Sequence, residues 1–403
     1  MNIKTLYITY MGLREPLLYS QALNYLKKLS SKGVSVYLLS FEKKQFLTKD
    51  SLTSLKNELD TAGITWFFLK YHKRFQFISK PYDIIRGMFF VLYVTCRENI
   101  DVIHARGTMC AIIGMLGWFF MKKKMIFDMR GLMAEEYLDA GLWRKDGFAY
   151  TCVNRFERYF LKHSDEVVVL THKIKDMQTR KYAIKHATVI PTCVDLERFN
   201  VYEDCGDAVK TRYSLGGKFV VIYTGSLGTW YMFSEMLDFY KELIISMPDT
   251  TFFILSQTER AWIEQQIPDD VRKNVIIDST DPWNVASFLN VADAGIFFIK
   301  PCLSKIASCP TKFGEYLACG LPVIINKGIG DTEELVRKEK IGVVIEDFNI
   351  EEYRKRILEM RELLREGDAL RSRCRSVAER HFSLKDGSEK YADIYVRLAQ
   401  RKN

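Results

Sequence analysis

Short apolar segments alternate with amphipathic ones along the whole chain. In the first half the predicted strands are 4–10, 34–41, 64–69, 101–105, 124–129, 166–170 and 187–191. In the second half they are 219–224, 251–255, 274–277, 294–299, 322–326 and 342–345. Stretches with helical spacing, such as 84–96, 108–121 and 148–163, fill the gaps. Because short apolar strands separated by helices are typical of βαβ units, we expect an α/β fold with doubly wound parallel sheets.

The pattern occurs twice, and the two runs are separated by a polar, glycine-bearing stretch at 196–218. A chain of 403 residues is too long for one ordinary core, so two domains are expected. We predict an N-terminal domain at 1–196 and a C-terminal domain at 197–384, followed by a charged helix at 385–403.

Composition narrows the class of protein. Hydrophobic residues make up 48% of the chain and aromatic residues 13%, which indicates a globular protein. The nine cysteines are scattered without a C-x-x-C pair, as expected of reduced thiols in the cytoplasm. The N-terminus shows no signal-peptide pattern. No D-x-D motif or metal-ligand spacing occurs, so we expect no metal and no other cofactor.

The net charge of +9 is unevenly distributed, because residues 1–196 carry +12 and the remainder carries −3. A basic first half is either a solvated surface or a site for anionic lipid headgroups or a diphosphate-bearing acceptor. The apolar run Met109–Met121 is followed directly by Lys122, Lys123 and Lys124. This run is too short to span a bilayer, and it fits a core helix or a helix in a membrane interface. No nucleic-acid-binding module accompanies these charges, so no nucleic-acid partner is expected.

The segment Ser308–Asn326 predicts a short helix that is followed by a buried strand. Pro310 suits the first helical position and Gly320 suits the helix end. Free N–H groups near Thr311 and Lys312 would then form a site for phosphate at the positive end of the helix dipole. Glu315, one turn further along the same face, can accept hydrogen bonds from sugar hydroxyls. Without a ligand, the same segment would be an ordinary surface helix of a βαβ unit.

Several smaller groups of residues follow other predicted strands. The turn with Gly225, Ser226 and Gly228 permits close backbone approach to a ligand, although tight βα turns often have such glycines without one. Four polar side chains follow two strands of the first half, where α/β sheets bind ligands: His104, Arg106, Asp128 and Arg130. A histidine at a strand end is also commonly structural.

The segment Ser308–Asn326 resembles the nucleotide-sugar signature of retaining GT-B glycosyltransferases of family 4, in the variant P-x-K-x-x-E-Y-L-A-x-G-x-P. The resemblance implies a GT-B fold, in which two Rossmann-like domains face each other across a cleft and the last helix packs on the first domain. It implies that Lys312, with Lys300, neutralises the donor diphosphate and that Glu315 holds the ribose. The loop with Gly12 and Arg14 would border the phosphates and the acceptor.

The chain departs from the family pattern at several places. Ala307 stands where many members have a glutamate that contacts the donor sugar, so Ser308 becomes a candidate for that contact. Ser226 and Trp230 occupy the region where an arginine and a lysine are common. Asp128 stands where a histidine is common, and we predict that Asp128 acts on the sugar or acceptor with His104 nearby.

The expected activity is therefore retaining, metal-independent transfer of a hexosyl or N-acetylhexosaminyl group from a nucleoside-diphosphate sugar to a hydroxyl. The expected acceptor is a lipid-linked or surface-polysaccharide glycan precursor, and the expected location is cytoplasmic, peripheral on the inner face of the membrane. Two alternatives stay open: a nucleotide-sugar epimerase of similar fold, and a non-catalytic sugar-nucleotide-binding scaffold.

Overall fold

The chain folds into two compact units. The computed structural model describes residues 3–15, 18–73, 76–202 and 206–400. The first unit comprises Met1–Pro191 with Leu384–Asn403, and the second comprises Thr192–Ser383. The sequence places the first boundary at 196. The structure places it earlier because Val194 donates its N–H to the Phe382 carbonyl at 2.7 Å and so belongs with the second unit.

The first unit contains a seven-stranded parallel sheet with the order β3-β2-β1-β4-β5-β6-β7. Its strands are β1 (Ile3–Ile8), β2 (Val34–Glu42), β3 (Ile64–Lys70), β4 (Val102–Arg106), β5 (Lys124–Asp128), β6 (Glu166–Val169) and β7 (Ala187–Val189). The strand order reverses at β1, and ligands of open α/β sheets bind beside such a point, at the carboxyl ends of the strands.

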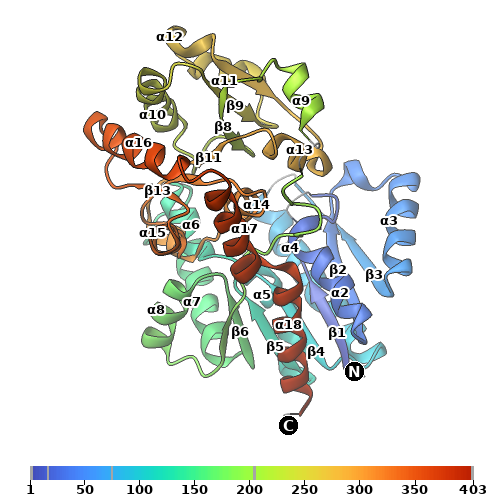
Figure 1. Ribbon diagram of the computed structural model, residues 1–403. Coiled ribbons are helices and arrows are strands. Elements are labelled where there is room, and N and C mark those ends of the chain that lie inside the picture. The colour runs from blue at the N-terminus through green and yellow to red at the C-terminus, as the bar shows by residue number, and fades with distance from the viewer. Residues whose placement is uncertain (1–2, 16–17, 74–75, 203–205, 401–403) are drawn as a thin grey trace. The chain divides into compact units, whose positions relative to one another are not determined.

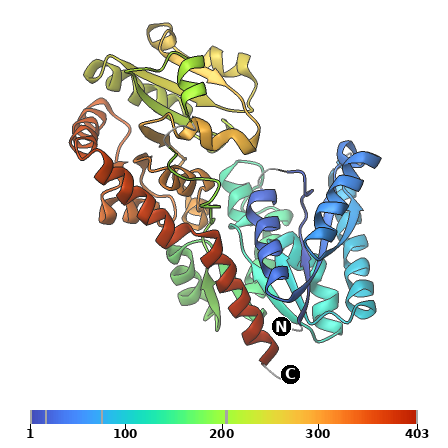
Figure 2. The same cartoon turned by 45° about the vertical axis from the view of Figure 1, so that its right-hand side comes forward.

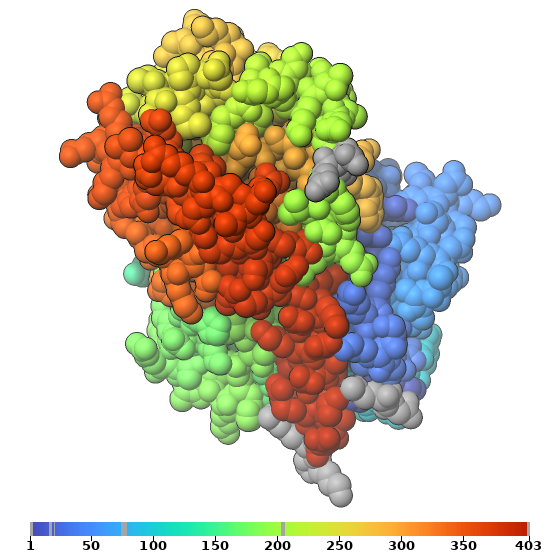
Figure 3. All heavy atoms as spheres, in the orientation of Figure 1, coloured from blue at the N-terminus to red at the C-terminus, as the bar shows by residue number. Residues whose placement is uncertain are grey.

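Helices cover both faces of this sheet. They are a short π-helix (Tyr19–Leu23), α2 (Asn24–Ser31), α3 (Lys49–Thr61), α4 (Gln76–Arg97), α5 (Thr108–Phe120), α6 (Met133–Asp139), α7 (Phe148–His163), α8 (His172–Tyr182) and α18 (Leu384–Gln400). A 3₁₀ turn spans Lys44–Phe46. The C-terminal helix α18 lies beside α2, as two views show (Figures 1 and 2). The space-filling view shows its side chains against those of the first helices (Figure 3). Residues 401–403, the end of the predicted terminal helix, lie outside the described part.

The second unit has a six-stranded parallel sheet with the order β10-β9-β8-β11-β12-β13. Its strands are β8 (Phe219–Thr224), β9 (Thr250–Leu255), β10 (Val275–Asp278), β11 (Ala294–Phe297), β12 (Val323–Asn326) and β13 (Gly342–Ile345). Its α-helices are α9 (Asp207–Arg212), α10 (Phe233–Ser246), α11 (Arg260–Gln266), α12 (Asp269–Arg272), α13 (Val285–Leu289), α14 (Thr311–Ala318), α15 (Thr332–Glu339), α16 (Ile350–Leu364) and α17 (Asp368–Phe382). Two 3₁₀ turns span Pro282–Asn284 and Leu303–Ala307.

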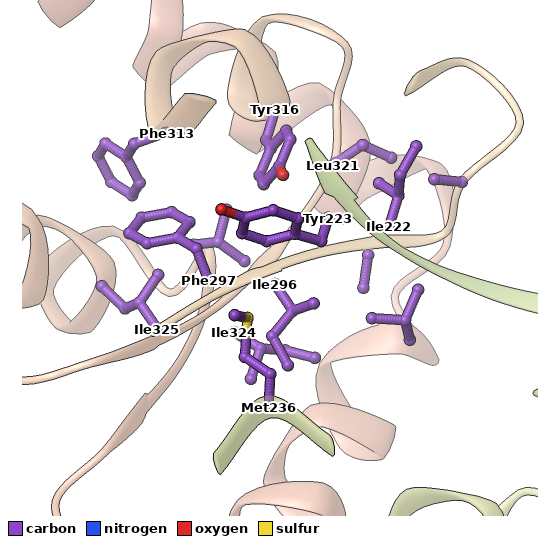
Figure 4. Packing of buried hydrophobic residues seen from close by; sticks show 14 of the residues in the cluster. Ile222, Tyr223, Met236, Ile296, Phe297, Phe313, Tyr316, Leu321, Ile324 and Ile325 are labelled. Atoms are coloured by element: carbon purple, nitrogen blue, oxygen red, sulfur yellow. The ribbon is translucent and has the colours of Figure 1, made fainter. Parts of the chain in front are cut away.

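Residues of β11 pack against helices on both faces of the second sheet. Phe297 of β11 packs with Phe313 and Tyr316 of α14, and all three are fully buried. Ile296, its neighbour in the strand, points the other way toward Met236 of α10 (Figure 4). Because side chains alternate along a strand, α14 and α10 lie on opposite faces of this sheet.

The predicted strands all form, with bounds that differ by at most two residues. The helix predicted at 84–96 is longer, because α4 begins at Gln76 and includes Pro81. The polar stretch at 196–218 is part of the second unit rather than a separate linker. Within it, Tyr202 donates its N–H to the Asn290 side chain at 2.9 Å.

Candidate functional site

The turn after β8 is shaped by two glycines in the left-handed region. Gly225 has φ of +110° and Gly228 has φ of +113°, values that side chains strongly disfavour. The Gly225 N–H donates to the Leu255 carbonyl at 2.9 Å, and the Tyr223 hydroxyl donates to the Ser226 carbonyl at 2.7 Å. The turn is therefore held rigidly at the carboxyl edge of the second sheet. Ser226 is exposed on it.

The predicted phosphate-binding helix is α14. Pro310 caps this helix with an extended ψ of 127°, so helical residues begin at Thr311, one position later than predicted. Gly320 takes a left-handed φ of +73° just after the helix, as predicted. Pro310 offers no side-chain acceptor to the first turn. The positive end of the helix dipole there is suited to an anion.

Lys312 has an unusual environment for a lysine. It is only 6% exposed, and its Nζ makes no hydrogen bond with any described residue. The Nζ lies 3.9 Å from the centre of the Tyr223 ring and 3.8 Å from that of the Tyr231 ring. A Cβ built on Gly225 would lie 3.3 Å from this nitrogen. The ammonium is thus enclosed by two ring faces beside the glycine turn.

Burial lowers the pKa of Lys312 well below its usual value, although the nearby Glu315 carboxylate opposes this shift. Burial also raises the pKa of Glu315 to about 7, against the opposing effect of Arg198 and Lys312. A buried cation without a hydrogen-bond acceptor is costly. The geometry therefore leaves Lys312 able to bind an anion that arrives from outside the protein.

Tyr316 ties α14 to the strand that precedes the glycine turn. Its hydroxyl accepts hydrogen bonds from the Thr224 N–H at 2.8 Å and from the Thr224 hydroxyl at 3.1 Å. Its ring lies on Gly295 of β11, where a Cβ would come within 2.1 Å of Tyr316 Cδ2. Only glycine at 295 lets α14 approach the sheet this closely, and Figure 4 shows the Tyr316 ring beside Tyr223.

The other predicted donor residues have different surroundings. Lys300 is exposed, and its backbone N–H donates to the Trp230 carbonyl at 2.8 Å. Ser308 is half-buried, and its N–H donates to the Lys305 carbonyl at 3.1 Å. The backbone of residues 305–309 was a candidate for the sugar contact, but the side chain of Lys305 was not predicted. It is 7% exposed, with its Nζ 3.8 Å from the centre of the Trp230 ring. The aromatic residues that follow Gly228, such as Trp230, could have indicated a second lysine packed against a ring.

The predicted catalytic residues of the first unit come together, but they lie beneath α18. His104 and Asp128 are each 1% exposed, with His104 Nε2 3.6 Å from Asp128 Oδ2. Tyr391 donates to Asp128 at 3.1 Å, and the Tyr395 hydroxyl lies 2.7 Å from His104 Nδ1. This burial gives the pair a structural environment, and contact with a substrate stays a prediction.

Arg106 and Arg130 flank the Asp128 carboxylate at 3.9 and 3.5 Å. Burial alone would raise the pKa of Asp128, but Arg130, His104 and Arg106 outweigh it and lower the pKa. The pKa of His104 is also lowered, in its case because burial disfavours the charged imidazolium. The cluster is therefore a buried carboxylate held between two guanidinium groups, with a neutral imidazole beside it.

A pocket of about 320 Å³ lies at the carboxyl edge of the first sheet. Aromatic and methionine side chains form most of its lining, and two lysines and one glutamate add charge: Tyr10, Met11, Glu15, Phe41, Lys43, Tyr71, Lys80, Met109, Met133, Tyr137 and Trp143. Gly12 also lines it, and a Cβ there would come within 2.7 Å of Glu42 Oε2. Arg14 is exposed and donates to the Ser51 carbonyl at 3.3 Å, so it is not part of this lining.

Within the described residues, no group of three or more histidine, cysteine, aspartate or glutamate side chains is arranged to hold a metal ion. The same residues contain no helix that is both long enough and apolar enough to cross a bilayer.

Two family models match the sequence. Residues 20–198 match the model described as Glycosyltransferase Family 4, and residues 305–377 match Glucosyltransferase 3-like, C-terminal domain. No curated protein sequence is similar enough to count as a match.

Solved structures resemble the whole chain in fold. A glycosyltransferase from Rickettsia africae has a TM-score of 0.75 at 15% identity, with all of both chains covered. Anabaena HepE in complex with UDP-glucose has a TM-score of 0.71 at 13% identity, covering 98% of this chain and 100% of that one. A putative UDP-N-acetylglucosamine 2-epimerase from Listeria monocytogenes has a TM-score of 0.63 at 14% identity, covering 100% and 98%. At these identities the likeness shows the fold alone.

Proposed function

We propose that this chain, whose residues 20–198 match the model of glycosyltransferase family 4 and whose fold is GT-B, transfers a sugar from a nucleoside-diphosphate sugar with retention and without a metal. The transferred group in this proposal is a hexosyl or N-acetylhexosaminyl unit. The acceptor is a hydroxyl of a lipid-linked or surface-polysaccharide glycan precursor.

The enclosed ammonium of Lys312 is the observation that carries the proposal. It lies on the first turn of α14, next to the Gly225 turn, and finds no acceptor among the described residues. A donor diphosphate placed there would take hydrogen bonds from this ammonium and from the N–H groups of the helix end. Transfer releases the diphosphate with added negative charge, so these preorganised groups would stabilise the leaving group as the glycosidic bond breaks.

Glu315 would hold the ribose in this arrangement. It follows Lys312 by three residues on α14, so both side chains lie on neighbouring positions of one helix face. Its carboxylate would accept hydrogen bonds from the ribose hydroxyls, and the pKa of about 7 makes this interaction sensitive to pH. The UDP-glucose complex of the structurally similar HepE supports a nucleotide sugar as the ligand class.

The pocket in the first unit suits the acceptor. Tyr137 and Trp143 stack at 4.3 Å between ring centres, and Lys80 Nζ lies 5.9 Å from the Tyr137 ring. Aromatic faces with nearby cations fit a sugar ring that carries a phosphate group.

A panel of nucleotide sugars tests the proposal and separates it from its alternatives. Purified protein is incubated with each donor, with and without membranes, while free UDP or GDP and the sugar nucleotide itself are measured. Release of nucleoside diphosphate that requires an acceptor, with retained anomeric configuration in the product, is expected. Conversion of the donor to an isomer would indicate an epimerase instead. Tight binding without turnover would indicate a scaffold.

A further inference from the structure

The outer face of α4 carries a row of large exposed hydrophobic side chains. Tyr82, Ile85, Phe89 and Tyr93 are between 53% and 63% exposed. Their spacing of three, four and four residues places them on one side of the helix. Each turn of the row thus presents one large apolar side chain to solvent, and such a continuous row is uncommon on a water-facing helix.

The opposite face of α4 packs closely against α5. Gly87 and Gly117 let α4 and α5 approach closely, because a Cβ on Gly87 would meet Ile113 at 3.0 Å and one on Gly117 would meet Thr95 Oγ1 at 3.1 Å. The exposed row is therefore not a core surface left open by a loosely docked helix.

Two more exposed aromatic residues end the neighbouring helix. Phe119 and Phe120, the last residues of α5, are each 66% exposed. Lys123 Nζ lies 3.5 Å from Asn99 Oδ1, which places the end of α5 beside the end of α4. We call the row on α4 and these two phenylalanines the apolar face.

The charges around the apolar face are mostly positive. Arg86 and Arg97 belong to α4, and Lys122 and Lys123 follow the end of α5 after Met121. Arg97 also covers the Tyr93 ring at 5.4 Å. Two acidic residues lie between 79 and 98. Asp83 is fully buried, with Oδ1 2.6 Å from His72 Nδ1, and Glu98 is half-buried and ion-paired with Arg97 at 2.5 Å. The α5 helix contains no charged residue.

We propose that the apolar face docks the protein on the surface of an anionic lipid bilayer. Tyrosine and phenylalanine would enter the headgroup boundary, while the surrounding arginine and lysine side chains bind lipid phosphates. A symmetric contact between two copies of this face would bring like charges together, so the charge pattern favours lipid as the partner. The helix lies in the interface and does not cross it.

The docking surface goes beyond the transfer reaction and does not depend on it. It would nevertheless serve a lipid-linked acceptor, since Lys80 lines the pocket and lies two residues before Tyr82 in α4. Binding to vesicles is measured without donor or acceptor, so its failure would leave the proposed activity standing, and the reverse also holds.

Co-sedimentation with vesicles tests the proposal. The full-length protein is mixed with vesicles of phosphatidylcholine alone or with an equal amount of phosphatidylglycerol. We expect binding to the anionic vesicles only, and we expect it to weaken as salt is added. Replacing Arg86 and Lys122 together by glutamine should lower the partition coefficient by roughly 30-fold.

Two further variants separate the contribution of the apolar face from non-specific hydrophobic adsorption to vesicles. The double change Phe89→Gln with Phe119→Gln should abolish binding. Ile245→Gln should leave it unchanged, because Ile245 is 69% exposed on α10 of the second unit. Thermal melting and nucleotide binding confirm that each variant is folded. The proposal is overturned if the wild type ignores anionic vesicles, or if Phe89→Gln with Phe119→Gln binds normally. It is also overturned if light scattering shows a dimer that this double change dissolves while vesicle binding is absent.

Discussion

Replacing Lys312 by methionine should lower the affinity for the nucleotide without markedly lowering the free energy of unfolding. Methionine keeps most of the side-chain volume and can still contact the rings of Tyr223 and Tyr231 through its sulfur. What it removes is the buried ammonium, which makes no hydrogen bond with a described residue. The variant thus isolates the charge from the packing.

The expected magnitudes follow from the surroundings of the nitrogen. Hydrogen bonds from a charged donor to a diphosphate contribute about 1.5–3 kcal/mol, so the Kd for UDP or GDP should rise roughly 10- to 150-fold. Removing an unpaired buried cation relieves about 1–3 kcal/mol, and losing its two ring contacts costs about 1–2 kcal/mol. The free energy of unfolding should therefore change by between about −1 and +2 kcal/mol.

Calorimetric titration with UDP and GDP measures the affinity, and thermal melting without ligand measures the stability. Lys355→Met on α16 is the matched control, since Lys355 is exposed in the same unit and should change neither value. Unchanged affinity in Lys312→Met, or a marked loss of stability, would refute the assignment of this lysine to an external anion.

Three further predictions follow from buried groups. Nucleotide affinity should increase as the pH rises through about 7, where Glu315 ionises, and calorimetry on Glu315→Gln should show no such increase. Glu157 is buried with a pKa raised to about 7, so the folded state retains a proton that the unfolded state releases near pH 4.5. Stability should therefore fall by roughly 3 kcal/mol between those pH values, and melting curves of Glu157→Gln should lack that fall. Gly295→Ala should lower stability by about 1–3 kcal/mol or more because its methyl group would strike Tyr316, whereas Gly216→Ala, which meets open space, should melt like the wild type.

The strands could be predicted from the sequence because each is a short apolar run bounded by polar or glycine residues. Local signals also identified α14, whose end at Gly320 follows from the backbone freedom of glycine. The start of the helix was misplaced by one residue because proline fits both the cap and the first turn, and only ψ distinguishes them.

Long-range contacts could not be predicted in the same way. The burial of His104 and Asp128 depends on Tyr395 and Tyr391, which lie more than 260 residues later in the chain. The enclosure of the Lys312 Nζ likewise depends on Tyr231, whose ring reaches α14 because the turn bends at Gly228. No spacing rule along the sequence connects such residues, since the sheet order brings them together.

The place of α18 in the first unit sets an order for folding during synthesis. Residues 384–400 leave the ribosome after the entire second unit, so Thr5, His104 and Asp128 must wait for their tyrosine partners. At typical elongation rates this delay is roughly 10 to 40 s. The first unit is thus the first to be synthesised and the last to finish folding. Until α18 is synthesised, the polar side chains of Thr5, His104 and Asp128 lack the helix that covers them.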